Sequence, residues 1–272
     1  TAMQRIERRM KKAHSLLCVG LDPDLQSMPK TFHSSKTPLF DFNVMVISAT
    51  HRYVCAYKLN SAFYEAFGAH GIQQLYDTCE FLHKEHSDIP IILDAKRSDI
   101  DSTNVGSVKF AFEYLGVDAV TLNPYLGRQA LRPFLERKDK ICIVLCRTSN
   151  PGAGEFQDVR DTRSKPLYLR VARNVAKQWN TNKNCMLVVG ATYPGELTKV
   201  RGIVGDMTIL VPGVGTQGGD LQRVLRAGLN TKKGGLMMTI SRAILYAGNQ
   251  KNIENAAQQY CTHIEELRRA QK

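Results

Sequence analysis

Short apolar runs recur along the chain at fairly even intervals, and amphipathic stretches separate them. Each run is rich in aliphatic and β-branched residues and is nearly continuous in its apolar character, which is typical of strands buried on both faces of a sheet. The stretches between the runs, such as residues 72–84 and 166–179, carry apolar residues at helical spacing. The predicted strands are residues 15–22, 53–60, 89–96, 119–125, 140–148, 185–192, 207–214 and 235–242.

This alternation of strands and helices predicts parallel pairing, because parallel strands need crossover connections and helices commonly supply them. Eight such units in about 240 of the 272 residues predict an α/β fold, a (β/α)8 TIM barrel forming a single domain over residues 1–272. Helices at residues 41–49 and 253–270 are expected before the second strand and after the last. A doubly wound open sheet is the alternative, although it would use fewer strands.

The composition, 43% hydrophobic and 23% charged, is close to a globular average and excludes disordered and collagen-like classes. The longest apolar runs fall short of the roughly 18–20 residues of a transmembrane helix. The charged first residues lack the apolar core of a secretory signal, so the seven cysteines are expected to be reduced thiols. We therefore expect a protein without a membrane partner that is cytoplasmic, or located in an intracellular organelle if the full-length protein carries a signal absent from this sequence.

The formal net charge is +12, and the basic excess is concentrated in residues 160–201 and in the first twelve residues. A basic surface attracts anions, either nucleic acid or an anionic small substrate. Aromatic residues are few and no nucleic-acid-binding motif is evident, so a solvated helix face is the preferred interpretation. A basic nucleic-acid-binding barrel is kept as an alternative, but no nucleic-acid partner is predicted.

Conspicuous polar residues stand where the predicted strands end. In barrels of this type the chemistry lies at the carboxyl ends of the strands. These residues are therefore expected to form a charged ring at one mouth of the barrel. In chain order they are Asp22, Lys58, Asn60, Asp94, Lys96, Asn123, Arg147, Thr148, Ser149, Ser241 and Arg242.

The third predicted strand carries the most informative pattern. Asp94 and Lys96 are two residues apart and so project to the same side of a strand, and Asp99 follows just past the strand end. With Lys58 on the neighbouring strand, charges of alternating sign share a small volume, which allows each to stay ionised despite burial. A purely structural ion-pair network is the alternative interpretation.

A glycine-rich segment follows the seventh predicted strand. Gly213, Gly215 and Gly218 satisfy the G-x-G-x-x-G pattern, but a dinucleotide site also needs an acidic residue about 20 positions on, where Met238 stands. In a barrel, the loops after the last two strands often bind phosphate, and Arg242 would add a bidentate charge. The segment therefore predicts a phosphorylated small-molecule substrate.

The stretch of residues 147–164, after the fifth predicted strand, has glycines and no apolar period. Loops of this length inside a compact domain are usually functional lids or disordered. A lid that closes over a ligand is the functional interpretation, and a merely flexible loop is the alternative.

Taken together, these motifs closely resemble the orotidine 5′-phosphate decarboxylase family. The resemblance rests on Asp94-x-Lys96-x-x-Asp99 with Lys58 upstream, and on the segment 212–217 and Ser241-Arg242 downstream. It spans residues 15–247, and residues 147–152 and 123–125 are similar to the bacterial-type branch. Sugar-phosphate decarboxylases of the same barrel superfamily share Asp-x-Lys-x-x-Asp and are the alternative. They hold Mg²⁺ with additional carboxylates at the strand ends, which the second predicted strand lacks.

The resemblance implies cofactor-free and metal-free decarboxylation of orotidine 5′-monophosphate to UMP in pyrimidine biosynthesis. It implies that Lys96 protonates C6 as carbon dioxide leaves and that Asp94 lies against the substrate carboxylate. Lys58 and Asp99 would complete the network of alternating charges. A Schiff-base aldolase using Lys58 or Lys96 is less favoured, because neighbouring carboxylates keep lysines charged and poorly nucleophilic.

The resemblance also implies substrate contacts from several loops and a homodimer. Asp22 would bind a ribose hydroxyl and Ser149 the pyrimidine amide. Asp99 and Thr103 would reach into the site of the partner subunit, and Asp101 departs from the glycine that members often carry there. Some eukaryotic relatives are fused to orotate phosphoribosyltransferase, which leaves open a fused or associated partner of that kind. The remaining implied substrate-binding residues are Asn123, Pro212, Gln217 and Arg242, with Gln217 and Arg242 on the phosphate.

Overall fold

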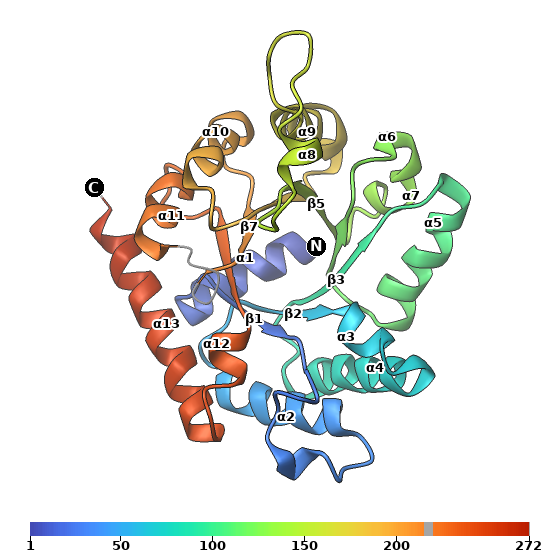
Figure 1. The fold of residues 1–272 in the computed structure, drawn as a ribbon, viewed down its shortest axis with the longest axis vertical. Helices are drawn as coiled ribbons and strands as arrows, with labels where there is room; N and C mark the ends of the chain where they lie inside the picture. Colours follow the sequence, from blue (N-terminus) through green and yellow to red (C-terminus); the bar gives the residue numbers. More distant parts are fainter. Residues whose placement is uncertain (215–219, 272) are drawn as a thin grey trace.

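Within residues 1–214 and 220–271, which the computed structural model describes, eight parallel strands close into a barrel (Figure 1). Each strand pairs with its neighbours in chain order, and β8 closes the barrel on β1. The TIM-barrel prediction is confirmed, and the open sheet is excluded by this closure. The strands are β1 (Leu17–Leu21), β2 (Ala56–Asn60), β3 (Ile91–Arg97), β4 (Ala119–Leu122), β5 (Ile141–Arg147), β6 (Cys185–Val189), β7 (Ile209–Pro212) and β8 (Leu236–Ile240).

Helices surround the barrel and cover the outer face of its sheet (Figure 1). The helices expected at residues 41–49, 72–84 and 253–270 form within α2, α4 and α13, and the one expected at 166–179 is α9 continued by a π-helical turn, Val175–Trp179. A second π-helical turn, Lys109–Tyr114, continues α5. The α-helices are α1 (Ala2–Ala13), α2 (Pro38–Thr50), α3 (Ser61–Glu65), α4 (Gly68–Glu85), α5 (Asp101–Val108), α6 (Gly127–Ala130), α7 (Arg132–Leu135), α8 (Gly154–Gln157), α9 (Leu167–Asn174), α10 (Pro194–Val204), α11 (Leu221–Gly228), α12 (Arg242–Leu245) and α13 (Gln250–Ala270).

The core has two parts, because side chains of a strand point alternately to its two faces. One cluster lies between the sheet and the surrounding helices. The other fills the barrel itself and makes it a packed core rather than a pore. The buried residues of this inner cluster are Ala2, Ile6, Cys18, Cys55, Ala56, Ile92, Ala119, Ile141, Ile143, Met186, Val188, Leu210 and Met237.

The N-terminal helix α1, which the sequence pattern did not predict, closes one end of the barrel. Its Ala2 and Ile6 belong to the inner core cluster. The buried Arg9 donates from Nε to the carbonyl of Val54, ahead of β2, at 2.9 Å, and Figure 1 shows α1 crossing behind the middle of the barrel. Because α1 blocks the amino ends of the strands, a ligand can enter the barrel from their carboxyl ends.

All seven cysteines are buried and free. Burial raises the pKa of the Cys18 and Cys146 thiols to about 12, which keeps both thiols protonated at neutral pH. Among the described residues, no helix is long and apolar enough to cross a membrane.

Candidate active site

A cavity of about 690 Å³ opens where the strands end. Every strand contributes to its lining, either with its last residues or with the residues just beyond them. Gln217, predicted on the phosphate, lies outside the described residues. The predicted site residues that line the cavity are Asp22, Lys58, Asp94, Lys96, Ser149, Pro212 and Arg242.

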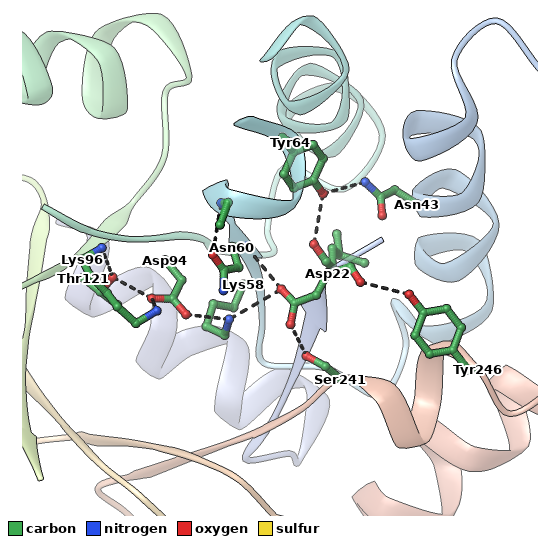
Figure 2. A network of polar contacts seen from close by, with 12 residues as sticks. Asp22, Asn43, Lys58, Asn60, Tyr64, Asp94, Lys96, Thr121, Ser241 and Tyr246 are labelled. Atoms are coloured by element: carbon green, nitrogen blue, oxygen red, sulfur yellow. Dashed lines mark hydrogen bonds and ion pairs between the residues drawn. The ribbon is translucent and has the colours of Figure 1, made fainter. Parts of the chain in front are cut away.

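Four of these side chains form a chain of alternating charge across β1, β2 and β3 (Figure 2). Lys58 Nζ lies 3.8 Å from Asp22 Oδ1 and 2.9 Å from Asp94 Oδ2. Lys96 Nζ donates to the other oxygen of Asp94, Oδ1, at 2.8 Å. Asp94 therefore stands between two ammonium groups, one from its own strand and one from β2.

Burial and neighbouring charges have opposite effects on the pKa values of Lys58 and Asp94. Burial by itself lowers the pKa of Lys58, but the carboxylates of Asp22 and Asp94 outweigh it and hold that pKa above its ordinary value. Burial by itself raises the pKa of Asp94, but the ammonium groups of Lys58 and Lys96 hold it well below its usual range. Lys58 and Asp94 are therefore both ionised at neutral pH.

The two lysines differ in exposure. The side chain of Lys58 is 6% exposed, whereas that of Lys96 is 48% exposed. Lys58 is thus enclosed by its two carboxylate partners, and Lys96 presents its ammonium group to the cavity. Of the two, Lys96 is the one that can meet a bound molecule.

The backbone at Lys96 is unusual. Its φ is +46°, in the left-handed region that a non-glycine residue occupies at a cost of about 1–3 kcal/mol. The register between β3 and β4 shifts between Leu93 and Arg97, so Lys96 sits in a bulge. The side chain of Thr121, on β4, contacts this bulge: its Oγ1 accepts from Lys96 N at 2.9 Å and donates to Asp94 Oδ1 at 2.8 Å.

Asp22 is held by three elements. Its Oδ2 accepts from Ser241 Oγ, after β8, at 2.6 Å, and its Oδ1 accepts from the backbone N of Asn60 at 3.3 Å. Ser241 can approach because residue 20 is glycine: a Cβ at Gly20 would lie 1.8 Å from Ser241 Oγ. One carboxylate therefore joins the ends of β1, β2 and β8.

Two tyrosines, the buried Tyr64 and the partly buried Tyr246, support the backbone on either side of Asp22 (Figure 2). Tyr246 donates to the carbonyl of Asp22 at 3.1 Å and accepts from the backbone N of Asp24 at 2.8 Å. Tyr64 donates to the carbonyl of Leu21 at 3.0 Å. Burial raises the pKa of Tyr246 to about 12, so its hydroxyl remains a donor at neutral pH.

The segment after β5 is more ordered than its sequence predicted. It contains the short helix α8 (Gly154–Gln157), and Gln157 lines the cavity together with Thr148, Ser149 and Asn150. Gln157 holds the start of the segment, because its Oε1 accepts from Thr148 N at 2.9 Å and its Nε2 donates to Thr148 Oγ1 at 2.8 Å.

Arg147, the last residue of β5, does not face the cavity. It is buried, its guanidinium lies 4.1 Å from the ring centroid of Tyr193, and it donates to Gln157 Oε1 at 3.2 Å and to Asp158 at 3.1 Å. These contacts tie the β5 segment to the loop before α10. The structure thus gives the segment fixed contacts through Gln157 and Asp158, at the carboxyl end of α8, and its role as a lid stays a prediction.

Three predicted site residues are not brought into this cavity. Asp99, just before α5, and Thr103, in its first turn, are exposed, and Asn123 is exposed after β4. The bulge at Lys96 interrupts the strand alternation, so residues beyond it do not continue toward the cavity. Within one subunit the second carboxylate of the charged chain is Asp22, not Asp99.

Sequence reasoning missed several residues that organise the site. Thr121, Tyr64 and Tyr246 are single polar residues within or beside apolar segments, and none belongs to a recognisable motif. Ser241 was recognised as a strand-end residue, but its bond to Asp22 depends on barrel closure. Within residues 1–214 and 220–271, no group of three His, Cys, Asp or Glu side chains could hold a metal ion.

Comparison with known proteins gives a consistent result. Residues 15–260 match the orotidine 5′-phosphate decarboxylase / HUMPS family. A curated orotidine 5′-phosphate decarboxylase from Herpetosiphon aurantiacus is 45% identical over 255 residues, which cover 94% of this chain and 93% of that protein. The solved structure of Leishmania donovani OMP decarboxylase superimposes with a TM-score of 0.89 at 36% identity, covering 99% of this chain and all of that one. The structure of Leishmania donovani UMP synthase matches at 37% identity and a TM-score of 0.89 over 98% of this chain, but over 56% of its own length.

Proposed function

We propose that Lys96 is the general acid of the reaction that this chain catalyses. The chain belongs to the orotidine 5′-phosphate decarboxylase / HUMPS family and converts orotidine 5′-monophosphate to UMP in pyrimidine biosynthesis. The observation that supports this role is the charged chain Asp22–Lys58–Asp94–Lys96. Of the two lysines in this charged chain, Lys58 is enclosed, whereas Lys96 is half exposed and faces the cavity. The enzyme is a carboxy-lyase.

The chemistry explains why a fixed ammonium group is needed. When the bond between C6 and the carboxylate breaks, carbon dioxide leaves and the electron pair stays on C6 as a vinyl carbanion. The pyrimidine offers that pair no electron sink, so the barrier reduction required is at the upper end of the roughly 8–23 kcal/mol that enzymes achieve. An ammonium group aimed at the developing carbanion supplies electrostatic stabilisation without reorganisation. Lys96 then gives a proton to C6 and is left as a neutral amine, which water in the open cavity reprotonates.

Asp94 holds the ammonium group of Lys96 in place through a hydrogen bond of 2.8 Å, and Lys58 in turn holds Asp94. Asp94 is ionised, and in the proposal it lies beside the substrate carboxylate, where repulsion is relieved as carbon dioxide departs. Lys58 pairs with the other oxygen of Asp94 and so keeps a buried carboxylate ionised. The proposed mechanism uses no metal and no organic cofactor.

The rest of the cavity binds the nucleotide. Asp22 accepts from a ribose hydroxyl, Ser149 contacts the pyrimidine amide, and Arg242 binds the phosphate at the start of α12. Pro212 also lines the cavity and is proposed to contact the substrate. Gln217 would join Arg242, by the family resemblance. Binding the phosphate far from C6 contributes free energy that offsets strain at the reacting bond.

The proposed homodimer accounts for the predicted residues outside the cavity. Asp99 and Thr103 are exposed, and they adjoin exposed apolar side chains, which are typical of an interaction surface. In the proposal, this surface meets a second subunit, and Asp99 and Thr103 enter the cavity of the partner; Asn123 lies at its edge. Among the exposed apolar residues, Ile100 and Val105 lie close to Asp99 and Thr103 along the chain, and Tyr125 and Leu126 follow Asn123.

Asp101 does not bring an unpaired charge to that surface. Its Oδ2 accepts from Arg132 of α7 at 2.9 Å. The aspartate therefore has a partner within its own subunit, so its presence where relatives often carry glycine is compatible with the proposed dimer.

A fused or associated orotate phosphoribosyltransferase is the proposed source of substrate. The support is the match to Leishmania donovani UMP synthase, of which this chain covers 56%. Bacterial relatives such as the Herpetosiphon aurantiacus protein match over nearly their full length. A cytoplasmic location remains a prediction.

The test is the ultraviolet absorbance of orotidine 5′-monophosphate with the purified protein, with and without EDTA. We expect rapid loss of the orotate absorbance in both conditions. Lys96→Ala is expected to lower kcat by about 10²–10⁴-fold or more, since 10²–10⁴-fold is the usual contribution of a general acid. The Kd for UMP should stay close to that of the wild type. Near-full activity of Lys96→Ala would refute the role of Lys96. Activity only on a sugar phosphate, and only with Mg²⁺, would instead indicate the sugar-phosphate decarboxylases.

A further inference from the structure

A threonine hydroxyl lies at the junction of Lys96 and Asp94. Thr121 Oγ1 accepts from the backbone N of Lys96 at 2.9 Å and donates to Asp94 Oδ1 at 2.8 Å. The same Asp94 oxygen accepts from Lys96 Nζ at 2.8 Å. One hydroxyl therefore links the main chain of the lysine to the carboxylate that holds its ammonium group (Figure 2).

The strand register shows why a side chain is needed at this point. Leu93 pairs with Val120, and the next pairing joins Arg97 to Leu122. Residues 94–96 of β3 thus stand opposite Thr121 alone, and the regular backbone ladder is interrupted there. Thr121 supplies with its side chain the acceptor that the interrupted ladder does not supply to Lys96.

The same contact stabilises an unfavourable backbone. Lys96 has φ +46°, a conformation that persists in a non-glycine residue only when its surroundings hold it. The side chain of Lys96 is half exposed and so is not confined by packing. Its direction depends on the backbone bulge and on Asp94, and Thr121 is bonded to both.

We propose that Thr121 is a positioning residue for decarboxylation: its hydroxyl holds Lys96 and Asp94 in one fixed relation, so that the ammonium group lies where C6 is protonated. This inference rests on the proposed function, because it assigns Thr121 a role only through Lys96. A displacement of about 1 Å at a reacting group can cost 10²-fold in rate. Loss of the hydroxyl should therefore lower kcat rather than weaken nucleotide binding.

The experiment compares Thr121→Val, which keeps the shape and removes the hydroxyl, with Thr121→Ser, which keeps the hydroxyl. We expect Thr121→Val to lower kcat about 10–10²-fold, with KM for orotidine 5′-monophosphate and Kd for UMP changed less than about threefold. Thr121→Ser should recover most of kcat. A purely structural threonine would show neither the selective loss of kcat nor the rescue by serine.

Thr50→Val is the matched control. Thr50 is also fully buried, and its hydroxyl donates to the carbonyl of Val46 at 2.8 Å and bonds to Tyr57 Oη at 2.7 Å, away from the cavity. We expect it to lower the thermal midpoint about as much as Thr121→Val does, and to leave kcat within about twofold of wild type.

The outcomes separate the two proposals. Wild-type kcat in Thr121→Val, an equal loss in Thr121→Ser, or a loss seen in KM and UMP binding instead of kcat would each overturn the role of Thr121 while leaving the proposed function intact. A wild-type protein that does not turn over orotidine 5′-monophosphate would overturn both. Selective loss of kcat with rescue by serine would establish the positioning role.

Discussion

Lys58 and Asp94 form an enclosed ion pair between adjacent strands, with Nζ 2.9 Å from Oδ2 and side chains that are 6% and 13% exposed. All four members of the charged chain line the cavity, but Asp22, Lys58 and Asp94 are largely enclosed, whereas the side chain of Lys96 is 48% exposed. Lys58 and Asp94 depend on each other, because a buried charge without its partner is strongly unfavourable.

Replacing Lys58 should therefore damage stability as well as rate. In Lys58→Met, Asp22 and Asp94 would face each other without the ammonium group between them. We expect the free energy of unfolding to fall by about 3–5 kcal/mol, the usual result of removing one member of a buried pair. Urea unfolding measures this change. The double variant Lys58→Met/Asp94→Leu should recover part of the loss, and an unaltered stability of Lys58→Met would contradict the pairing.

The depressed pKa of Asp94 predicts how stability depends on pH. The carboxylate is favoured in the folded state, so its contribution is fully present above the ordinary aspartate pKa of about 3.9 and is lost as the pH falls below that value toward the folded-state pKa. Asp94→Asn should therefore flatten the acid side of the stability curve. Unfolding free energies measured between about pH 2 and pH 7 test this. The control is Glu7→Gln, at an exposed position of α1, which should keep the wild-type slope.

The approach of Ser241 to Gly20 predicts a steric effect on substrate binding. In Gly20→Ala the new Cβ would lie 1.8 Å from Ser241 Oγ and 3.0 Å from Asp22 Oδ2, so both side chains must move. We expect a higher KM than in Ser241→Ala, which loses only the 2.6 Å hydrogen bond to a carboxylate, worth about 1.5–3 kcal/mol or roughly 10–10²-fold. Steady-state kinetics of both variants would show the order. Equal KM values for the two variants would indicate that a Cβ at residue 20 does not disturb substrate binding.

Arg242 should act on the phosphate rather than on the chemistry. It is exposed at the start of α12 and lines the cavity, so Arg242→Ala should fold normally. Loss of charge-assisted bonds of about 1.5–3 kcal/mol predicts a KM for orotidine 5′-monophosphate raised roughly 10–10²-fold. Orotidine without phosphate serves as the control substrate. Its kcat/KM should be the same for Arg242→Ala and wild type, and a parallel loss with both substrates would argue against a phosphate contact.

Local patterns in the sequence were sufficient for the barrel and for the centre of the charged chain. Strands buried on both faces read as continuous apolar runs, and their number and the helices between them indicate a closed parallel sheet. Asp94, Lys96 and Lys58 stand at strand ends, where position along the strand already places a residue at the mouth. The pattern was insufficient for α1, because its arginines obscure the few apolar residues that enter the barrel.

The sequence by itself thus determined which strands form, that they pair in parallel, and which charged residues share one end of them. Tertiary structure alone decided that Asp22 rather than Asp99 completes the chain in one subunit, that Ser241 reaches Asp22 across the closure of β8 on β1, and that Thr121 supports the bulge at Lys96. The reason is physical: hydrophobic periodicity is a local property of the chain. A hydrogen bond between residues far apart in the sequence depends on strand register, on a bulge and on barrel closure, which appear only when the strands are packed together.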